Sequence, residues 1–266
     1  MDSIPYSAYP DDPLRQFDFY LPELPHLTHV PPLICFIHGG AWKSEDKRDH
    51  AQLARSLATA TRCPVAVPNY RLTPRDNQDP SFRHPIHAED ILAFLVFVRK
   101  WRNQESAPFD PDSLVLLGHS CSAHMLSAIF LGSDQASLNP AQDLLRAVKG
   151  IVMSEGIYDL DALIARFPAY HQWFIEPTFG PSESYERFSA LRYPLRPSSE
   201  ISWLLLHSKG DTLIDLDQTR AMHSHLTQIA PLAVSINTED LKEEHDDIFT
   251  SDTYLKIVSQ FISKFM

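Results

Sequence analysis

Short apolar runs alternate with amphipathic stretches along almost the whole chain. Several of the runs lack the period-two alternation of a half-exposed strand, which is typical of strands covered on both faces. Between them, apolar residues recur at helical spacing, as in residues 84–103. The predicted strands cover residues 16–21, 32–37, 64–70, 113–118, 148–154, 201–207 and 233–237, and the predicted helices 47–60, 84–103, 121–131, 141–147, 217–228 and 253–265.

Strands that alternate with helices indicate βαβ units, and therefore an α/β fold with a mostly parallel central sheet and helices on both faces. Binding and catalytic sites of such sheets lie at the carboxyl ends of the strands. One segment, residues 157–199, breaks the alternation and is rich in aromatic residues and prolines. A connection of this length predicts a lid-like insertion, with most aromatic residues packed on the body and a few lining a pocket.

The length and composition predict one domain spanning residues 1–266, because no linker-like tract interrupts the chain. The net charge of −11 argues against nucleic acid and anionic membranes as partners. No apolar run approaches the roughly 18 residues of a membrane span. Three cysteines without C-x-x-C spacing, and an N-terminus unlike a signal peptide, favour a reducing, cytoplasmic location.

The stretch LVLLGHSCSAHM, residues 114–125, predicts a buried strand, a sharp turn and a helix. A serine on such a turn is typical of a hydrolase nucleophile, and Ser120 occupies that place. The motif is G-x-S-x-G, but Ser122 stands where the second glycine belongs. Because a serine is also small, Ser120 stays the candidate nucleophile, although the motif alone does not separate it from a structural serine.

Two further groups follow in the chain order Ser, Asp, His that α/β-hydrolases use. Asp211 lies just after a predicted strand, on a loop that follows Lys-Gly, and is the candidate acid. Asp215 is the alternative, but it suits better the role of capping the helix that follows. His245, in the polar loop between the last strand and the last helix, is the candidate base.

The turn His38-Gly39-Gly40 follows the strand at residues 32–37 and resembles the HGGG-type oxyanion turn of esterases. The expected oxyanion donors are the backbone N–H groups of Gly39, Gly40 and Cys121, while the thiol of Cys121 is expected to pack. No zinc-ligand spacing, P-loop or dinucleotide-binding motif is present, so we expect neither metal nor cofactor.

At these residues the chain resembles the α/β-hydrolase branch of the kynurenine formamidases, its fungal members most of all. The matching stretches are HGGAW (38–42), NYRLTP (69–74), HPIHAEDILAFLVFV (84–98), GHSCSAHM (118–125), EGIYDLDALIARFPAY (155–170), LLHSKGDTLIDLDQT (205–219) and EEHDDIF (243–249). HGGAW and NYRLTP are shared with a wider esterase group, whereas GIYDL followed by aromatic residues is more specific.

The resemblance implies a cofactor-free arylformamidase that hydrolyses N-formyl-L-kynurenine to L-kynurenine and formate, in tryptophan breakdown toward NAD. It implies Ser120, Asp211 and His245 as the triad, a small-molecule substrate, and the homodimer common among such enzymes. For the substrate's aromatic ring, Tyr158 and Trp173 are candidate contacts.

Trp42 is a further candidate contact. For the substrate carboxylate the candidates are Arg71 and Lys43, between which the sequence does not choose. Two alternatives stay open: a broad carboxylesterase or secondary-metabolite hydrolase of the same fold, and a non-catalytic binding protein on a hydrolase fold.

Overall fold

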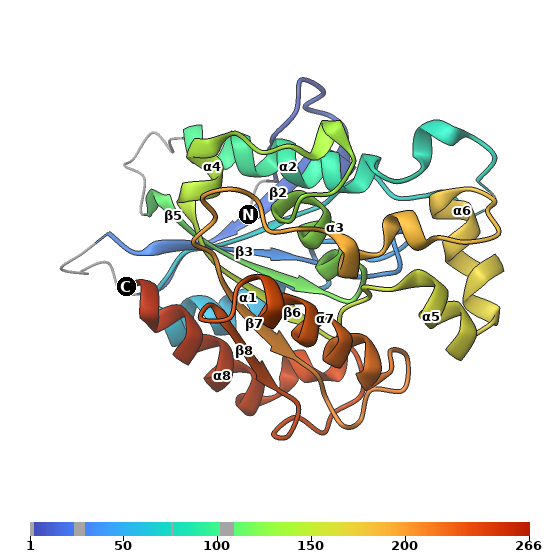
Figure 1. The fold of residues 1–266 in the computed structure, drawn as a ribbon. Helices are drawn as coiled ribbons and strands as arrows, with labels where there is room; N and C mark the ends of the chain where they lie inside the picture. The colour runs from blue at the N-terminus through green and yellow to red at the C-terminus, as the bar shows by residue number, and fades with distance from the viewer. Residues whose placement is uncertain (1–2, 24–29, 76, 102–108) are drawn as a thin grey trace.

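An eight-stranded sheet organises the computed structural model, which describes residues 3–23, 30–75, 77–101 and 109–266 (Figure 1). Its strand order is β1-β2-β4-β3-β5-β6-β7-β8. β1 and β2 pair antiparallel with their neighbours, and every pair from β4 to β8 is parallel. The strands are β1 Ile4–Pro5, β2 Gln16–Tyr20, β3 Pro32–Ile37, β4 Val65–Pro68, β5 Asp110–His119, β6 Val148–Ser154, β7 Ser202–Leu206 and β8 Val234–Asn237.

Helices cover both faces of this sheet, as Figure 1 shows for α1 and α8 on one side and α2, α3 and α4 on the other. The helices are α1 Ala51–Thr61, α2 Ile86–Lys100, α3 Cys121–Phe130, α4 Gln142–Ala147, α5 Leu160–Arg166, α6 Glu176–Phe179, α7 Leu216–Ile229 and α8 Asp252–Ile262. Two buried apolar clusters result: one joins the sheet to α2, α3, α4 and α7, the other to α1 and α8. The prediction of an α/β-hydrolase type of fold is confirmed.

The predicted elements differ from the observed ones mainly at their ends. The helix expected from residue 47 begins at Ala51, because Lys47 is held in a turn by an ion pair with Asp18 (Nζ–Oδ1, 2.8 Å) and by a bond from its N–H to Asn69. The helix expected over 84–103 begins at Ile86, and its last predicted residues, 102 and 103, lie outside the described residues. The two-residue strand β1 was not predicted.

Residues 157–199, called here the aromatic segment, connect β6 to β7 beyond the carboxyl ends of the strands (Figure 1). The segment contains α5, a π-helical turn at His171–Ile175, α6 and two 3₁₀ turns. Most of its aromatic side chains are buried, whereas Trp173 is 57% exposed. The segment therefore packs as a layer of its own over one end of the sheet, as expected.

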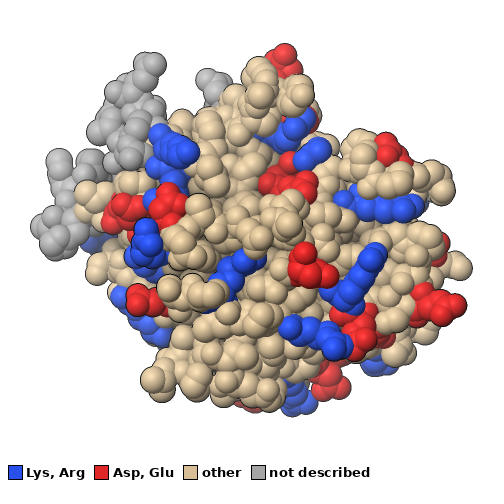
Figure 2. Space-filling view, turned by 45° about the horizontal axis from the view of Figure 1, so that its top comes forward, with Lys and Arg blue, Asp and Glu red and all other residues tan. Residues whose placement is uncertain are grey.

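The charged side chains show no segregation on the face drawn in Figure 2, where acidic and basic groups are interspersed. All three cysteines are free and buried. No helix among the described residues has the length and apolar character needed to span a bilayer.

Several histidines are buried in this fold, and they predict a loss of stability in acid. Burial lowers the pKa of His38, His119 and His124 to about 4, and that of His87 to about 3. Histidines of the unfolded chain titrate near 6.5, so the unfolded state binds more protons between pH 6.5 and 4. The free energy of unfolding should therefore fall as the pH falls through that window, as measured by urea unfolding at pH 7.5, 6 and 5.

His84→Phe is a matched variant for this test. Both ring nitrogens of His84 are buried without a partner among the described residues, and the ring packs against Phe179 and Phe188. As the pH falls, the free energy of unfolding of the variant should decrease less steeply than that of the unchanged protein. The difference in slope should be up to about 1.4 kcal/mol per pH unit. An equal loss in both proteins would contradict the assignment of a neutral, buried imidazole at this position.

Candidate active site

Five adjacent strands end at one edge of the sheet, and each is followed by a polar or glycine residue of the candidate site. β3 leads to Gly39 and Gly40, and β5 to Ser120. β6 leads to Glu155, β7 to Asp211, and β8 to His245. Parallel pairing in the order β3-β5-β6-β7-β8 thus brings together residues that lie far apart in the sequence.

Ser120 lies on the sharp turn between β5 and α3, with φ 55° and ψ −120°. Few residues with a side chain adopt this left-handed region, and such strain is common where a side chain must point into a site. The turn also brings α3 close to β5, because a Cβ on Gly118 would lie 2.8 Å from Leu126 Cδ1 and 3.1 Å from the backbone of Ser122. The glycine two residues before the nucleophile candidate therefore allows α3 to approach β5 closely.

Ser122 bonds to the neighbouring loop as well as filling the place of the second glycine. Its Oγ donates to the carbonyl oxygen of His38, immediately after β3. The thiol of Cys121 accepts a hydrogen bond from the N–H of Trp42 at 3.3 Å and is completely buried. Both contacts join the start of α3 to the loop 38–42. The thiol of Cys121, which was expected only to pack, also accepts a hydrogen bond from this loop.

The loop 38–42 is itself held in an unusual conformation. Gly40, Ala41 and Trp42 all have positive φ, at 87°, 51° and 61°. A Cβ on Gly40 would lie 2.3 Å from the carbonyl oxygen of Ser44, which excludes any other residue there. Within the described residues, the N–H groups of Gly39, Gly40 and Cys121 donate to no backbone or side-chain acceptor outside regular helices and strands, which leaves them available to a ligand.

His245 and Asp211 form a direct pair. Nδ1 of His245 lies 2.8 Å from Oδ2 of Asp211, and the other oxygen of Asp211 accepts the N–H groups of Leu213 and Ile214 at 2.8 and 2.9 Å. Burial raises the pKa of Asp211, but these hydrogen bonds outweigh it, so the pKa lies below its usual range. Asp215 instead caps α7 by accepting the N–H of Gln218.

Ser120 and His245 line one cavity of about 160 Å³. In the described part of the chain, the hydroxyl of Ser120 makes no hydrogen bond. Such bonds are often long before substrate binds, and they tighten afterwards. The cavity is lined by Gly40, Ala41, Ser44, Glu45, Ser120, Ile157, Tyr170, Trp173, Phe174, Leu213, Ile214, His245 and Asp246.

Of the expected substrate contacts, only Trp173 lines this cavity. Trp42 is completely buried and packs edge-on against His124 and Phe179. Tyr158 is also completely buried. The expectations for Trp42 and Tyr158 are therefore corrected, because both side chains belong to the buried core.

Arg71 is placed outside the cavity as well. Its guanidinium makes two hydrogen bonds to the buried carboxylate of Asp90, at 2.7 and 2.6 Å. Lys43 instead lines a second hollow that adjoins the first, and its Nζ donates to the carbonyl oxygens of Arg75 and Trp173. Of the two cations considered for a substrate carboxylate, Lys43 is the one beside the cavity.

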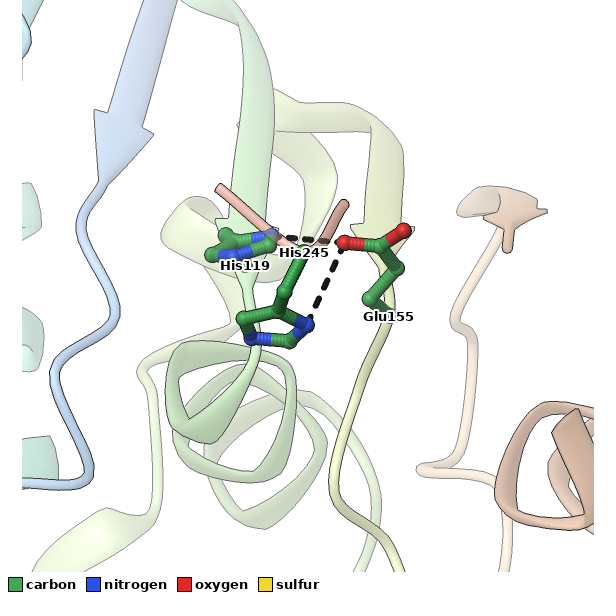
Figure 3. Close-up of side chains that lie close together, drawn as sticks. All are labelled: His119, Glu155 and His245. Carbon is green, nitrogen blue, oxygen red and sulfur yellow. Dashed lines mark ion pairs between the residues drawn. The ribbon is translucent and has the colours of Figure 1, made fainter. Parts of the chain in front are cut away.

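Glu155 follows β6 at the same edge of the sheet and is not among the site residues predicted from the sequence. Its carboxyl lies beside the packed rings of His119 and His245, and Figure 3 shows it pointing toward both. The signal available was a charged residue directly after an apolar strand, in MSEG. The three residues each offer one possible metal-ligand atom, and these atoms lie within 4.8 Å of one another. A metal ion at this point would compete with Asp211 for Nδ1 of His245.

Comparison with known proteins identifies the family. A family model described as BD-FAE, an α/β-hydrolase type of domain, matches residues 17–226. The chain belongs to the BD-FAE family. This BD-FAE protein is 27% identical to a kynurenine formamidase of Meyerozyma guilliermondii over 202 residues, 73% of this chain and 70% of the relative. The resemblance to kynurenine formamidases is confirmed.

The matches also include ester hydrolases. A probable carboxylic ester hydrolase of Mycobacterium tuberculosis, LipM, is 26% identical over 77% of this chain and 47% of the relative. The solved structure of esterase B from Lactobacillus rhamnosis superposes with a TM-score of 0.75 at 16% identity, covering 99% of this chain and 87% of that one. The protein is a hydrolase of the α/β type.

Two substitutions test which aromatic residues face the substrate. Trp173→Ala should raise KM and change the free energy of unfolding by no more than about 0.5 kcal/mol, because the side chain is half-exposed. Tyr158→Ala should lower the free energy of unfolding by about 3–5 kcal/mol, because it empties a fully buried site. Steady-state kinetics and urea unfolding measure both; the reverse pattern would contradict the placement of these rings.

Proposed function

We propose that this protein is a serine hydrolase in which Ser120 is the nucleophile, His245 the base and Asp211 the acid. The observation that carries the proposal is the 2.8 Å bond from His245 Nδ1 to Asp211, with His245 and Ser120 lining one cavity. Donation from Nδ1–H to Asp211 leaves the lone pair on Nε2, the nitrogen that a base needs. The order of these residues and their strand-end positions support the same roles.

In this mechanism Nε2 of His245 takes the hydroxyl proton of Ser120 as Oγ attacks the substrate carbonyl carbon. The negative charge that develops on the carbonyl oxygen is stabilised by the N–H groups of Gly39, Gly40 and Cys121. The imidazolium then gives its proton to the leaving nitrogen or oxygen, and the bond from carbon to that atom breaks. Water, deprotonated by His245, hydrolyses the acyl-enzyme and restores the Ser120 hydroxyl.

The substrate class best supported is an N-formyl arylamine, with N-formyl-L-kynurenine as the leading candidate. The relative of Meyerozyma guilliermondii carries the name of this activity. The cavity beside Ser120 is small, which suits a formyl group, and Tyr170, Trp173 and Phe174 offer rings to an aromatic leaving group. The resulting proposal is an arylformamidase that needs no cofactor and acts in tryptophan breakdown.

Ser120→Ala tests the nucleophile. The variant should release formate from N-formyl-L-kynurenine at least about 10³-fold more slowly than the unchanged protein, because the acyl-enzyme can no longer form. Its melting temperature should change little. Formate release by both purified proteins measures the effect, and comparable turnover by the variant would contradict the proposal.

A broad carboxylesterase is the second candidate, favoured by the match to LipM. The two candidates differ in kcat/KM for N-formyl-L-kynurenine relative to p-nitrophenyl acetate. An arylformamidase prefers the formamide, so a large preference for the ester would favour the esterase. A binding protein without activity would leave Ser120 unreactive toward a fluorophosphonate.

Lys43 is proposed to meet the carboxylate of the substrate's amino-acid end. It lines the hollow that shares Gly40, Ala41, Ser44 and Trp173 with the cavity. Lys43→Met keeps the length of the side chain and removes its charge. KM for N-formyl-L-kynurenine should rise about 10- to 100-fold, the cost of a charged hydrogen bond, whereas KM for formanilide, which lacks the carboxylate, should change much less.

Formanilide is the matched control in this experiment, because it keeps the formyl group and the ring. An equal rise of KM for both compounds would show that Lys43 acts only by holding Trp173 and Arg75 in place. The location in the cytoplasm, the single domain and the homodimer stay predictions.

A further inference from the structure

A second carboxyl group lies beside the imidazole that Asp211 holds. Oε2 of Glu155 is 3.3 Å from Nδ1 of His245, the nitrogen that bonds Asp211 (Figure 3). Oε1 accepts the N–H of Ser208 at 3.1 Å, whereas Oε2 makes no hydrogen bond in the part of the chain that the structure describes. The side chain of Glu155 is completely buried. One carboxyl oxygen is thus held in place and the other is free beside the base.

The backbone of Glu155 is fixed in a conformation that few such residues adopt. Its φ is 51°, and its N–H donates to the carbonyl oxygen of Leu206, the last residue of β7, at 2.8 Å. A non-glycine residue keeps a left-handed conformation only where the surroundings determine it. The carboxyl is therefore placed beside His245 by the sheet itself, with Ser208 fixing its rotation.

The groups packed around this carboxyl decide its charge. Asp211 after β7, with Asp246 and Glu243 after β8, contributes negative charge; His119 at the end of β5 and Tyr254 of α8 complete the surroundings. Burial raises the pKa of Glu155 to about 10, the charge of Asp211 adds to the effect, and the N–H of Ser208 opposes it. At neutral pH the carboxyl carries a proton, and Nδ1 of His245 faces a single negative charge.

A second anion at this point would work against the base. A carboxylate within a few ångströms favours the charged form of a neighbouring imidazole, so a second one would oppose the return of the proton from the imidazolium to the leaving group. A neutral Glu155 avoids this effect while its oxygen stays beside Nδ1. If the charge of Asp211 is absent, the same oxygen is the nearest group that can replace it.

We propose that Glu155 is a positioning residue for His245, a protonated reserve carboxyl that becomes the anionic partner of Nδ1 when the charge of Asp211 is removed. The inference rests on the proposed triad of Ser120, His245 and Asp211. In an Asp211→Asn protein, Glu155 loses its proton to solvent as the pH rises. Its Oε2 then accepts the Nδ1–H of His245 and holds the tautomer that leaves Nε2 free to take the proton of Ser120.

The test compares Asp211→Asn with Asp211→Asn/Glu155→Gln between pH 6 and 9.5, with p-nitrophenyl acetate as substrate. The single variant should gain at least about tenfold in kcat/KM from pH 7 to 9, relative to the unchanged protein. The double variant should lack this gain and fall about 10- to 100-fold below the single variant at pH 9. Identical kcat/KM of the two variants at every pH would overturn the inference.

The two variants differ only by an amide for a carboxyl, so hydroxide attack on the ester affects both equally. Circular dichroism and thermal unfolding establish that both are folded. If the two variants that carry Asp211→Asn do not fold, Asp211→Ala and Asp211→Ala/Glu155→Gln provide the same comparison. Glu155→Gln alone should lower kcat/KM less than Asp211→Asn alone, because Asp211 still orients the imidazole. A larger loss of kcat/KM in Glu155→Gln would also overturn the inference.

The ester is chosen so that a wrong substrate assignment does not decide this test. Failure of the proposed function appears in a separate measurement, as activity that survives Ser120→Ala. If Ser120→Ala is inactive while the Asp211→Asn variants are indistinguishable, the triad stands and only the role of Glu155 is refuted.

Discussion

The 2.8 Å hydrogen bond between Asp211 and His245 is the interaction on which the candidate active site depends. It joins the loops that follow β7 and β8, and it selects the ring nitrogen that faces the cavity. The parallel register of the sheet makes the bond possible, because it ends five neighbouring strands at one edge. The left-handed turn at Ser120 and the strained loop 38–42 then complete the site around it.

Contacts between these loops keep the parts of the site together. Ser122 and Cys121 bond from the start of α3 to the loop that follows β3. His119 packs against His245 with ring centroids 4.4 Å apart, and its pKa, lowered by burial to about 4, keeps that ring neutral beside the base. The elbow serine, the oxyanion loop and the base thus form a single packed unit, in which electrostatic preorganisation is available before substrate arrives.

The sequence predicts much of this arrangement because its main determinants are local. Strands such as β3 are apolar throughout, and Asp211 and His245 follow strand ends in the order that the fold uses. The direction of a side chain in an irregular segment depends on packing between residues far apart in the sequence. The hydrophobic periodicity of the sequence carries no information about that packing. Tyr158 and Trp173 look alike in the sequence, yet one is completely buried and the other is 57% exposed. Glu155 was missed for a related reason, since its neighbours come from β5, β7 and the loop after β8.

The activation of Ser120 as a nucleophile is tested most directly by the intact mass of the protein after reaction with a fluorophosphonate, followed by peptide mapping. One adduct per chain, located on Ser120, is expected, and replacement of His245 by alanine should strongly slow the labelling. Labelling at another residue, or no labelling of the folded protein, would contradict the claim that Ser120 is a nucleophile activated by the His245–Asp211 pair.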